Sequence, residues 1–265
     1  MDLGSLALQG SLVTEVAVLV LFAFIPPAIF VIWIRNTERY GREPWGMILG
    51  MFIWGAFFAV IIGVILELIL SIPLQVNSPV EDFIARRFPD TDAFAVVFVA
   101  LVIAPFVEEF AKAYGVLRRQ AVIREPEDGY VYGATSGLGF SATENLIYGA
   151  FTFVLLGFIP SLVQIAIRSI SSSLLHASAT SVTGYGIARH RLWGPRFSAA
   201  PWYLAAVAMH AAFNGIAVVG SSIAQAYGDV GQLLLLAAAV VFSFLAISIV
   251  RGKIMEHDAR QGWVP

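Results

Sequence analysis

Long runs of apolar residues constrain this sequence more than any other feature. The runs cover about 14–34, 45–71, 92–117, 131–157, 160–188, 199–220 and 230–250. A helix rises about 1.5 Å per residue, so each run is long enough to cross a hydrocarbon core about 30 Å thick. Only 13% of the residues are charged, against about 25% in soluble domains. The sequence therefore predicts an all-α polytopic membrane protein with seven transmembrane helices.

The basic residues lie mainly in alternate connections between these runs. Twelve of them fall in the segments 35–44, 118–130, 189–198 and 251–260. The opposite connections contain two, Arg86 and Arg87. Because cytoplasmic loops are enriched in Lys and Arg, we expect the N-terminus outside and the C-terminus in the cytoplasm. Segment 78–90 is expected to be either a short amphipathic helix at the outer surface or an ordered loop.

No linker or repeat divides the sequence, so residues 1–265 are expected to form one integral membrane domain. The absence of cysteine excludes disulfides and a cysteine nucleophile. No basic patch is interleaved with aromatic residues, so nucleic acid is not an expected partner. The expected surroundings are the lipid bilayer.

Charged residues within the apolar runs give the strongest indication of function. The stretch APFVEEFAKAYGV places Glu108, Glu109 and Lys112 inside the third run, although a charge at mid-bilayer costs about 2.5–3.5 kcal/mol. The next three runs each hold one titratable residue near the same depth: Glu144, His176 and His210. Four consecutive helices therefore bring titratable groups to one level, which favours a shared polar site over separate structural contacts.

Several kinds of chemistry fit such a set. Glu108 and Lys112 are four residues apart and share a helix face, so a local ion pair is one alternative. Carboxylates and imidazoles can activate water, either as a general base or around a metal. The same groups can also move protons across a membrane. Arg168 is expected to pair with an acid such as Glu67, or to reach the outer surface.

Four short motifs occur in order on the central runs. They are EExxK from Glu108 to Lys112, FxxxE from Phe140 to Glu144 with Asn145 following, His176 in a small-residue helix, and HxxxN from His210 to Asn214. This ordered set resembles the PrsW family of intramembrane proteases, within the wider group of CAAX-processing and bacteriocin-immunity-type membrane proteases. The resemblance covers about 92–220, so these four helices would form the catalytic core. The runs at 14–34, 45–71 and 230–250 would be peripheral.

The resemblance implies hydrolysis of peptide bonds in a membrane-anchored regulatory protein. Carried over by position, Glu108 would activate the attacking water, and Glu109 and Lys112 would support it. Glu144 and His176 would complete the polar centre as catalytic groups or metal ligands. The remaining residues would bind the oxyanion or orient water (His210, Asn214) or support the site (Phe140, Asn145).

A metal is one open alternative, because Glu144, His176 and His210 could hold a divalent ion such as zinc with one position free. No HExxH spacing supports it, and CAAX-type relatives usually have histidine where Glu144 stands. Two other functions also stay open: a proton-coupled transporter using the same cluster, and a catalytically inert scaffold. The expected location is the cytoplasmic membrane of a prokaryote.

Overall fold

The computed structural model describes residues 3–74, 79, 82, 86 and 91–261. Within these ranges the chain is helical and contains no strand. The first half comprises α1 (Leu3–Arg35), α2 (Trp45–Ile53), η1 (Trp54–Ala59), α3 (Val60–Ser71), η2 (Ile72–Leu74), α5 (Thr91–Phe98), η3 (Val99–Ile103) and α6 (Ala104–Arg118). The second half comprises η4 (Gln120–Val122), α7 (Pro126–Leu156), α8 (Phe158–Trp193) and α9 (Ala200–Gln261). Most of segment 78–90, which was predicted to be either a surface helix or an ordered loop, lies outside the described residues.

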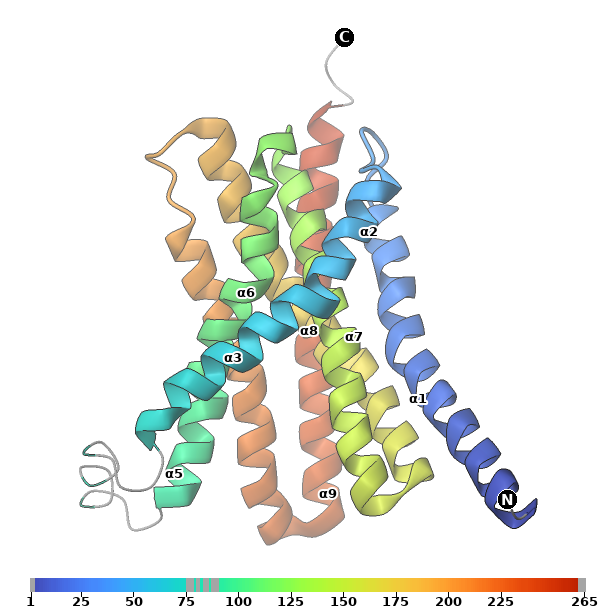
Figure 1. The fold of residues 1–265 in the computed structure, drawn as a ribbon. Coiled ribbons are helices and arrows are strands. Elements are labelled where there is room, and N and C mark those ends of the chain that lie inside the picture. The colour runs from blue at the N-terminus through green and yellow to red at the C-terminus, as the bar shows by residue number, and fades with distance from the viewer. Residues whose placement is uncertain (1–2, 75–78, 80–81, 83–85, 87–90, 262–265) are drawn as a thin grey trace.

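Two glycines in the left-handed region turn the chain. Gly157, with φ of 89°, separates α7 from α8, and Gly228, with φ of 61°, lies within α9. Side chains with a Cβ rarely adopt such angles. At Gly228 the chain reverses direction, so α9 consists of two antiparallel segments (Figure 1). These segments match the separate runs expected at 199–220 and 230–250.

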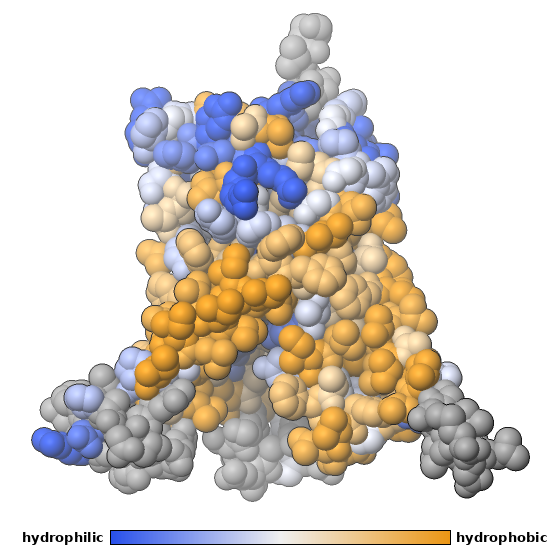
Figure 2. All heavy atoms as spheres, in the orientation of Figure 1, coloured by the Kyte–Doolittle hydropathy of each residue, from blue (hydrophilic) through white to orange (hydrophobic). Residues whose placement is uncertain are grey.

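The two ends of the described chain lie at opposite ends of the bundle (Figure 1). Five helical stretches are long and apolar enough to cross a membrane: Leu12–Arg35, Trp45–Leu74, Phe94–Arg118, Phe158–Trp193 and Leu233–Arg260. Apolar residues cover the middle of the visible face, and hydrophilic residues gather at the end that carries the basic loops (Figure 2). This arrangement confirms the predicted all-α membrane class, whereas seven crossings and their orientation stay predictions.

Helices α7 and α8 pack through glycines on α7. A Cβ at Gly133 would lie 2.4 Å from the carbonyl oxygen of Thr180, and one at Gly137 would lie 2.2 Å from that of His176. No side chain fits at such distances, so the two backbones are in direct contact, as small-residue spacing allows in membrane bundles. This contact fixes the position of His176 relative to α7.

Both π-helical segments receive a side-chain hydrogen bond from another helix. Thr143 on α7 donates its hydroxyl to the carbonyl of Ala56 in η1, at 2.7 Å. Asn214 on α9 donates its amide to the carbonyl of Ala100 in η3, at 2.8 Å. Single π-turns inside helices often occur at functional sites, and η3 lies directly before the EExxK motif.

Buried acids fasten the loops at the basic end. Asp258 near the end of α9 accepts hydrogen bonds from the backbone amides of Arg39 and Tyr40, at 3.0 and 2.9 Å. Tyr132 on α7 donates its hydroxyl to the carboxylate of Glu43. Burial raises the pKa of Glu38 and of Glu43 to about 8 each. These loop acids are therefore able to respond to pH near neutrality.

Candidate active site

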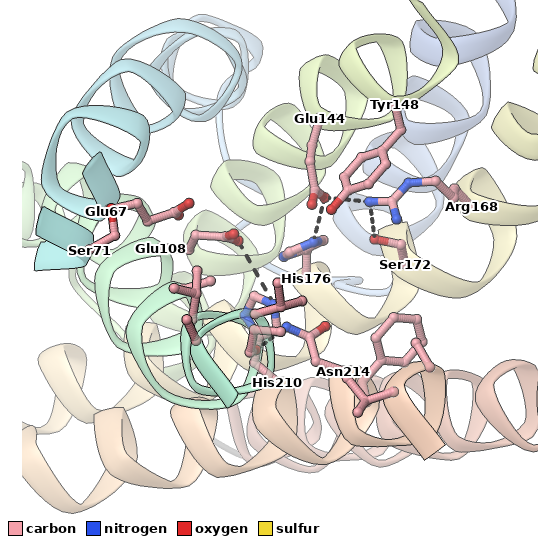
Figure 3. Close-up of a pocket in the computed structure, with 18 of the residues that line it drawn as sticks. Glu67, Ser71, Glu108, Glu144, Tyr148, Arg168, Ser172, His176, His210 and Asn214 are labelled. Atoms are coloured by element: carbon pink, nitrogen blue, oxygen red, sulfur yellow. Dashed lines mark hydrogen bonds and ion pairs between the residues drawn. The ribbon is translucent and has the colours of Figure 1, made fainter. Parts of the chain in front are cut away.

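A cavity of about 610 Å³ extends into the middle of the bundle. Its polar lining comes from α3, α6, α7, α8 and α9: Glu67, Ser71, Glu108, Glu144, Tyr148, Arg168, Ser172, His176, His210 and Asn214 (Figure 3). The lining also includes Leu74, Ala95 and Val96. Leu74 ends η2, and Ala95 and Val96 lie in α5, which is at the end of the bundle away from the basic loops (Figure 1). The cavity therefore reaches toward the end of the bundle opposite the basic residues.

The site residues predicted on four successive runs meet at this cavity. Glu108, Glu144, His176 and His210 all line it, as does Asn214. The two histidine rings lie at 88° to one another with their centres 4.9 Å apart. The four residues that the sequence placed at a similar depth therefore lie next to one another in the fold.

Glu109 lies behind the cavity and is fully bonded. Its Oε1 is 2.7 Å from Nζ of Lys112 and 3.0 Å from Nδ1 of His210. Its Oε2 accepts a hydrogen bond from the hydroxyl of Thr180 at 2.9 Å. Both Glu109 and Lys112 are 0% exposed. Each oxygen of Glu109 therefore already has a partner, and Glu109 is not among the residues that line the cavity.

Glu108 has the opposite environment. Its Oε2 is buried and has no hydrogen-bond partner among the described residues. The nearest charged or polar groups are Nζ of Lys112 at 3.5 Å and Nε2 of His210 at 3.8 Å. A buried carboxylate oxygen without a hydrogen bond is costly, so this oxygen is the one best placed to receive a ligand in the cavity.

Lys112 connects α6 to α8. Its Nζ lies 2.7 Å from Nδ1 of His176 and 4.5 Å from the centre of the Phe140 ring. The contact with His176 is shorter than the expected local pair with Glu108, which is 3.5 Å long. Lys112 therefore does more than neutralise an acid on its own helix. The sequence spacing indicated the partner at i−4, but only the packing of α6 on α8 could place His176 beside it.

Glu144 forms the second charged pair of the site. Its Oε2 is 2.8 Å from Nη2 of Arg168 and 2.9 Å from Nε2 of His176 (Figure 3). We expected Arg168 to pair with an acid such as Glu67, or to reach the outer surface; it does pair with an acid, but that acid is Glu144 and not Glu67. Arg168 turns inward because Asn145, directly after Glu144, also accepts from its Nε at 3.0 Å.

Three residues offer donor atoms that could hold a metal ion. Ligand atoms of Glu108, His176 and His210 lie within 4.8 Å of one another. This group differs from the expected one, which had Glu144 in place of Glu108. Glu144 is not in this group, and its Oε2 contacts Arg168 and His176.

These donors fit a divalent ion such as zinc, which takes imidazole and carboxylate ligands. Oε2 of Glu108 has no hydrogen bond, and Nδ1 of His210 is held by Glu109, which leaves its Nε2 as a lone-pair donor. Both nitrogens of His176 have partners, Lys112 and Glu144. An ion bound there would have to replace one of those two contacts.

Sequence reasoning did not assign several lining residues to the site. Glu67 and Ser71, four residues apart on α3, line the cavity, and the carboxylate of Glu67 points into it (Figure 3). Tyr148 and Ser172 lie on either side of Arg168. The i, i+4 spacing of Glu67 and Ser71 was a usable signal, whereas Tyr148 and Ser172 could be found only from their contacts.

Comparison with known proteins identifies the family. The model described as "PrsW family intramembrane metalloprotease" matches residues 43–247. Protease PrsW from Clostridioides difficile (strain 630) is 33% identical over 134 residues, which are 49% of this chain and 50% of that protein. The match with this relative thus spans about half of its length, and no solved structure matches the chain. With its apolar helices, the chain is an integral membrane protein. Because the family model covers most of its length, the chain belongs to the PrsW family of intramembrane metalloproteases.

Proposed function

We propose that this chain hydrolyses peptide bonds of a membrane-anchored protein in the cavity between α3, α6, α8 and α9. The observation that carries the proposal is the environment of Glu108. Its carboxylate oxygen is buried, lacks a hydrogen bond among the described residues, and faces the cavity next to two imidazoles. A base in that position can take a proton from a water molecule that attacks a carbonyl carbon.

The side chains around Glu108 can take part in each step. Glu108 accepts a proton as the water oxygen bonds to the carbonyl carbon, and the carbonyl oxygen becomes negatively charged. Asn214 lines the cavity and is proposed to donate a hydrogen bond to this oxyanion, and His210, whose Nε2 is unprotonated, is proposed to orient the water by accepting a hydrogen bond from it. When the carbon–nitrogen bond breaks, Glu108 returns the proton to the leaving nitrogen, which gives one carboxylic acid and one amine.

As the alternative to a metal-free site, we propose that Glu108, His176 and His210 hold a divalent metal such as zinc. When bound, such an ion would polarise the scissile carbonyl and make water more acidic. Four carboxylates (Glu67, Glu108, Glu109, Glu144) lie near two cations, Lys112 and Arg168. With all four carboxylates ionised, two negative charges would remain, which one divalent ion would balance.

The proposed setting is the cytoplasmic membrane of a prokaryote. The end of the bundle with twelve basic residues is proposed to face the cytoplasm. The cavity, which extends toward the other end, would then receive substrate from the outer half of the bilayer. Glu67 and Ser71 of α3 would be the first polar groups that such a substrate meets.

The test compares cells that express the chain with cells that express Glu108→Gln. New N-termini in membrane proteins are measured by mass spectrometry of terminal peptides. We expect one or a few membrane-anchored proteins to be cut only where Glu108 is intact. Glu256→Gln, a matched change at an exposed glutamate, should leave the cuts unchanged.

Identical N-termini in the wild-type and Glu108→Gln cells, at equal amounts of folded chain, would contradict proteolysis. Proton-coupled uptake into liposomes that depends on Glu144 would then support transport instead. A chain with neither activity would be a scaffold.

A further inference from the structure

Each histidine of the site is bonded to a carboxylate oxygen that a cation also contacts. For His210 the carboxylate is Glu109 and the cation is Lys112, with contacts of 3.0 and 2.7 Å. For His176 the carboxylate is Glu144 and the cation is Arg168, with contacts of 2.9 and 2.8 Å. Five of these six residues belong to the sequence motifs, and Arg168 belongs to none.

Arg168 is held more firmly than charge neutralisation requires. Its Nε donates to Oδ1 of Asn145 at 3.0 Å, and its Nη2 lies 3.4 Å from the hydroxyl of Ser172. Its guanidinium carbon lies 3.8 Å from the centre of the Tyr148 ring. The planar group is therefore fixed by contacts from α7 and α8, and it presents Nη2 to Glu144 in one orientation.

Asn145 is itself fixed. Its amide nitrogen lies within hydrogen-bond distance of the hydroxyls of Ser141 and Ser173, at 3.3 and 3.2 Å. Asn145, Ser141 and Ser173 are all 0% exposed. A buried polar network in which each member has its partners keeps a single arrangement, so the orientation of Arg168 is determined by the α7–α8 contact.

The partners of His176 determine which of its nitrogens carries a proton. Lys112 is a donor only, so Nδ1 accepts from it, and Nε2 carries the hydrogen that it donates to Glu144. If Glu144 were free to rotate, the ring would lose its partner at Nε2 and would be held only by Lys112 at Nδ1. Carboxylates that hold a ligating histidine in this way raise metal affinity by orienting the ring and fixing its tautomer.

We propose that Arg168 is a positioning residue of the active site, which holds Glu144 and thereby fixes the ring of His176 through its Nε2–H. Arg168 and Glu144 then do at Nε2 of His176 what Lys112 and Glu109 do at Nδ1 of His210. The part of this proposal that concerns metal affinity rests on the proposed metal site. The part that concerns the Nε2–H of His176 does not.

The first test measures Co²⁺ binding by the full chain in detergent micelles, by visible absorption, with Zn²⁺ in competition. Removal of such an orienting partner typically weakens metal binding about 10–100-fold. We expect this loss for Arg168→Gln. Arg168→Lys keeps the positive charge but lacks the several fixed donors of a guanidinium. Its Co²⁺ affinity should therefore lie between those of the wild type and Arg168→Gln. Arg191→Gln, an exposed arginine on the same helix, should bind Co²⁺ as the wild type does.

The second test measures the Nε2–H of His176 without metal, by ¹H and ¹⁵N NMR of histidine-labelled chain, with the His176 signals assigned from a His176→Gln sample. In the wild type we expect Nε2 to be protonated, Nδ1 to be unprotonated, and the Nε2–H to exchange slowly with water. In Arg168→Gln we expect this hydrogen to exchange faster, because Glu144 no longer holds it, while Lys112 still keeps Nδ1 unprotonated. Size-exclusion chromatography and thermal melting of each sample give the folded fraction.

The outcomes separate the two proposals. Wild-type chain that binds no Co²⁺ would overturn the metal site, while the NMR result would still decide the role of Arg168. Folded Arg168→Gln in which the Nε2–H of His176 exchanges as slowly as in the wild type would overturn the positioning role. Wild-type Co²⁺ affinity in that variant would overturn it as well, because a purely structural arginine affects only the folded fraction.

Discussion

Nζ of Lys112 and Nδ1 of His176 lie 2.7 Å apart, although 64 residues separate them in the sequence. This contact joins α6 to α8 in the centre of the bundle. Lys112 also bonds Glu109 at 2.7 Å, so one buried ammonium links a carboxylate and an imidazole of the site. The stability of the core and the geometry of the site therefore depend on the same atom.

We expect Lys112→Met to destabilise the chain strongly. Removing one partner of a buried ion pair leaves an uncompensated charge and costs about 3–5 kcal/mol. Thermal unfolding in detergent, followed by circular dichroism, measures the loss. The double variant Lys112→Met, Glu109→Gln should recover part of it, because the unpaired carboxylate is gone. Equal stability of wild type and Lys112→Met would show that the lysine contributes nothing to the core.

The α7–α8 contact gives a second prediction. Gly137→Ala places a methyl group where the carbonyl of His176 lies 2.2 Å away, so the helices must separate. Overpacking of this kind costs about 1–3 kcal/mol, and the displaced His176 should also weaken cleavage. Gly252→Ala on α9 is the control, since a Cβ there has nothing within 4 Å. If Gly137→Ala melts at the wild-type temperature, the backbone contact is not as close as described.

Stability should fall as the pH rises from about 5 to 8. Glu38 and Glu43 have a pKa near 4.5 when exposed, and burial raises it to about 8 in the folded chain. The folded state holds these protons more tightly than the unfolded state. The resulting stabilisation is complete below pH 4.5 and is lost by about pH 8.

Glu43→Gln tests this dependence, because glutamine keeps the size of the side chain but does not titrate. Melting temperatures in detergent between pH 5 and 9 should decline less steeply in this variant than in the wild type. Each kcal/mol corresponds to about 2–4 °C in a chain of this size. Glu256→Gln on the exposed end of α9 should keep the wild-type slope. A wild-type melting temperature that is flat over this range would contradict the prediction.

Metal removal should abolish cleavage if the proposed ion is present. Treatment with a zinc chelator, followed by dialysis, should remove activity, and added Zn²⁺ should restore it. Elemental analysis should find about one Zn²⁺ per wild-type chain and much less in Glu108→Gln and His210→Asn, because each variant loses a ligand. Full activity in a chain shown to be free of metal would instead support water activation by Glu108 alone.

The depth of the site residues was predictable because helices have a fixed rise. Counting along apolar runs brought Glu108, Glu144, His176 and His210 to one level, and the cavity contains all four. Counting residues along a run does not show which neighbouring helix a side chain faces, because the packing of the helices is not known from the sequence. For that reason Arg168 was assigned to the wrong acid, and Glu67 was not included in the site.

The sequence by itself determined the class of protein, the helices and the level of the polar residues. Those properties depend on apolar length and on backbone hydrogen bonds within each segment, which are local. Only the tertiary structure decided which carboxylate holds which histidine. The glycine contacts between α7 and α8 bring the backbones together and so place Glu144 and Arg168 at His176. Hydrogen bonds need distances of about 2.7–3.2 Å, and only the packing of helices against one another sets distances of that kind.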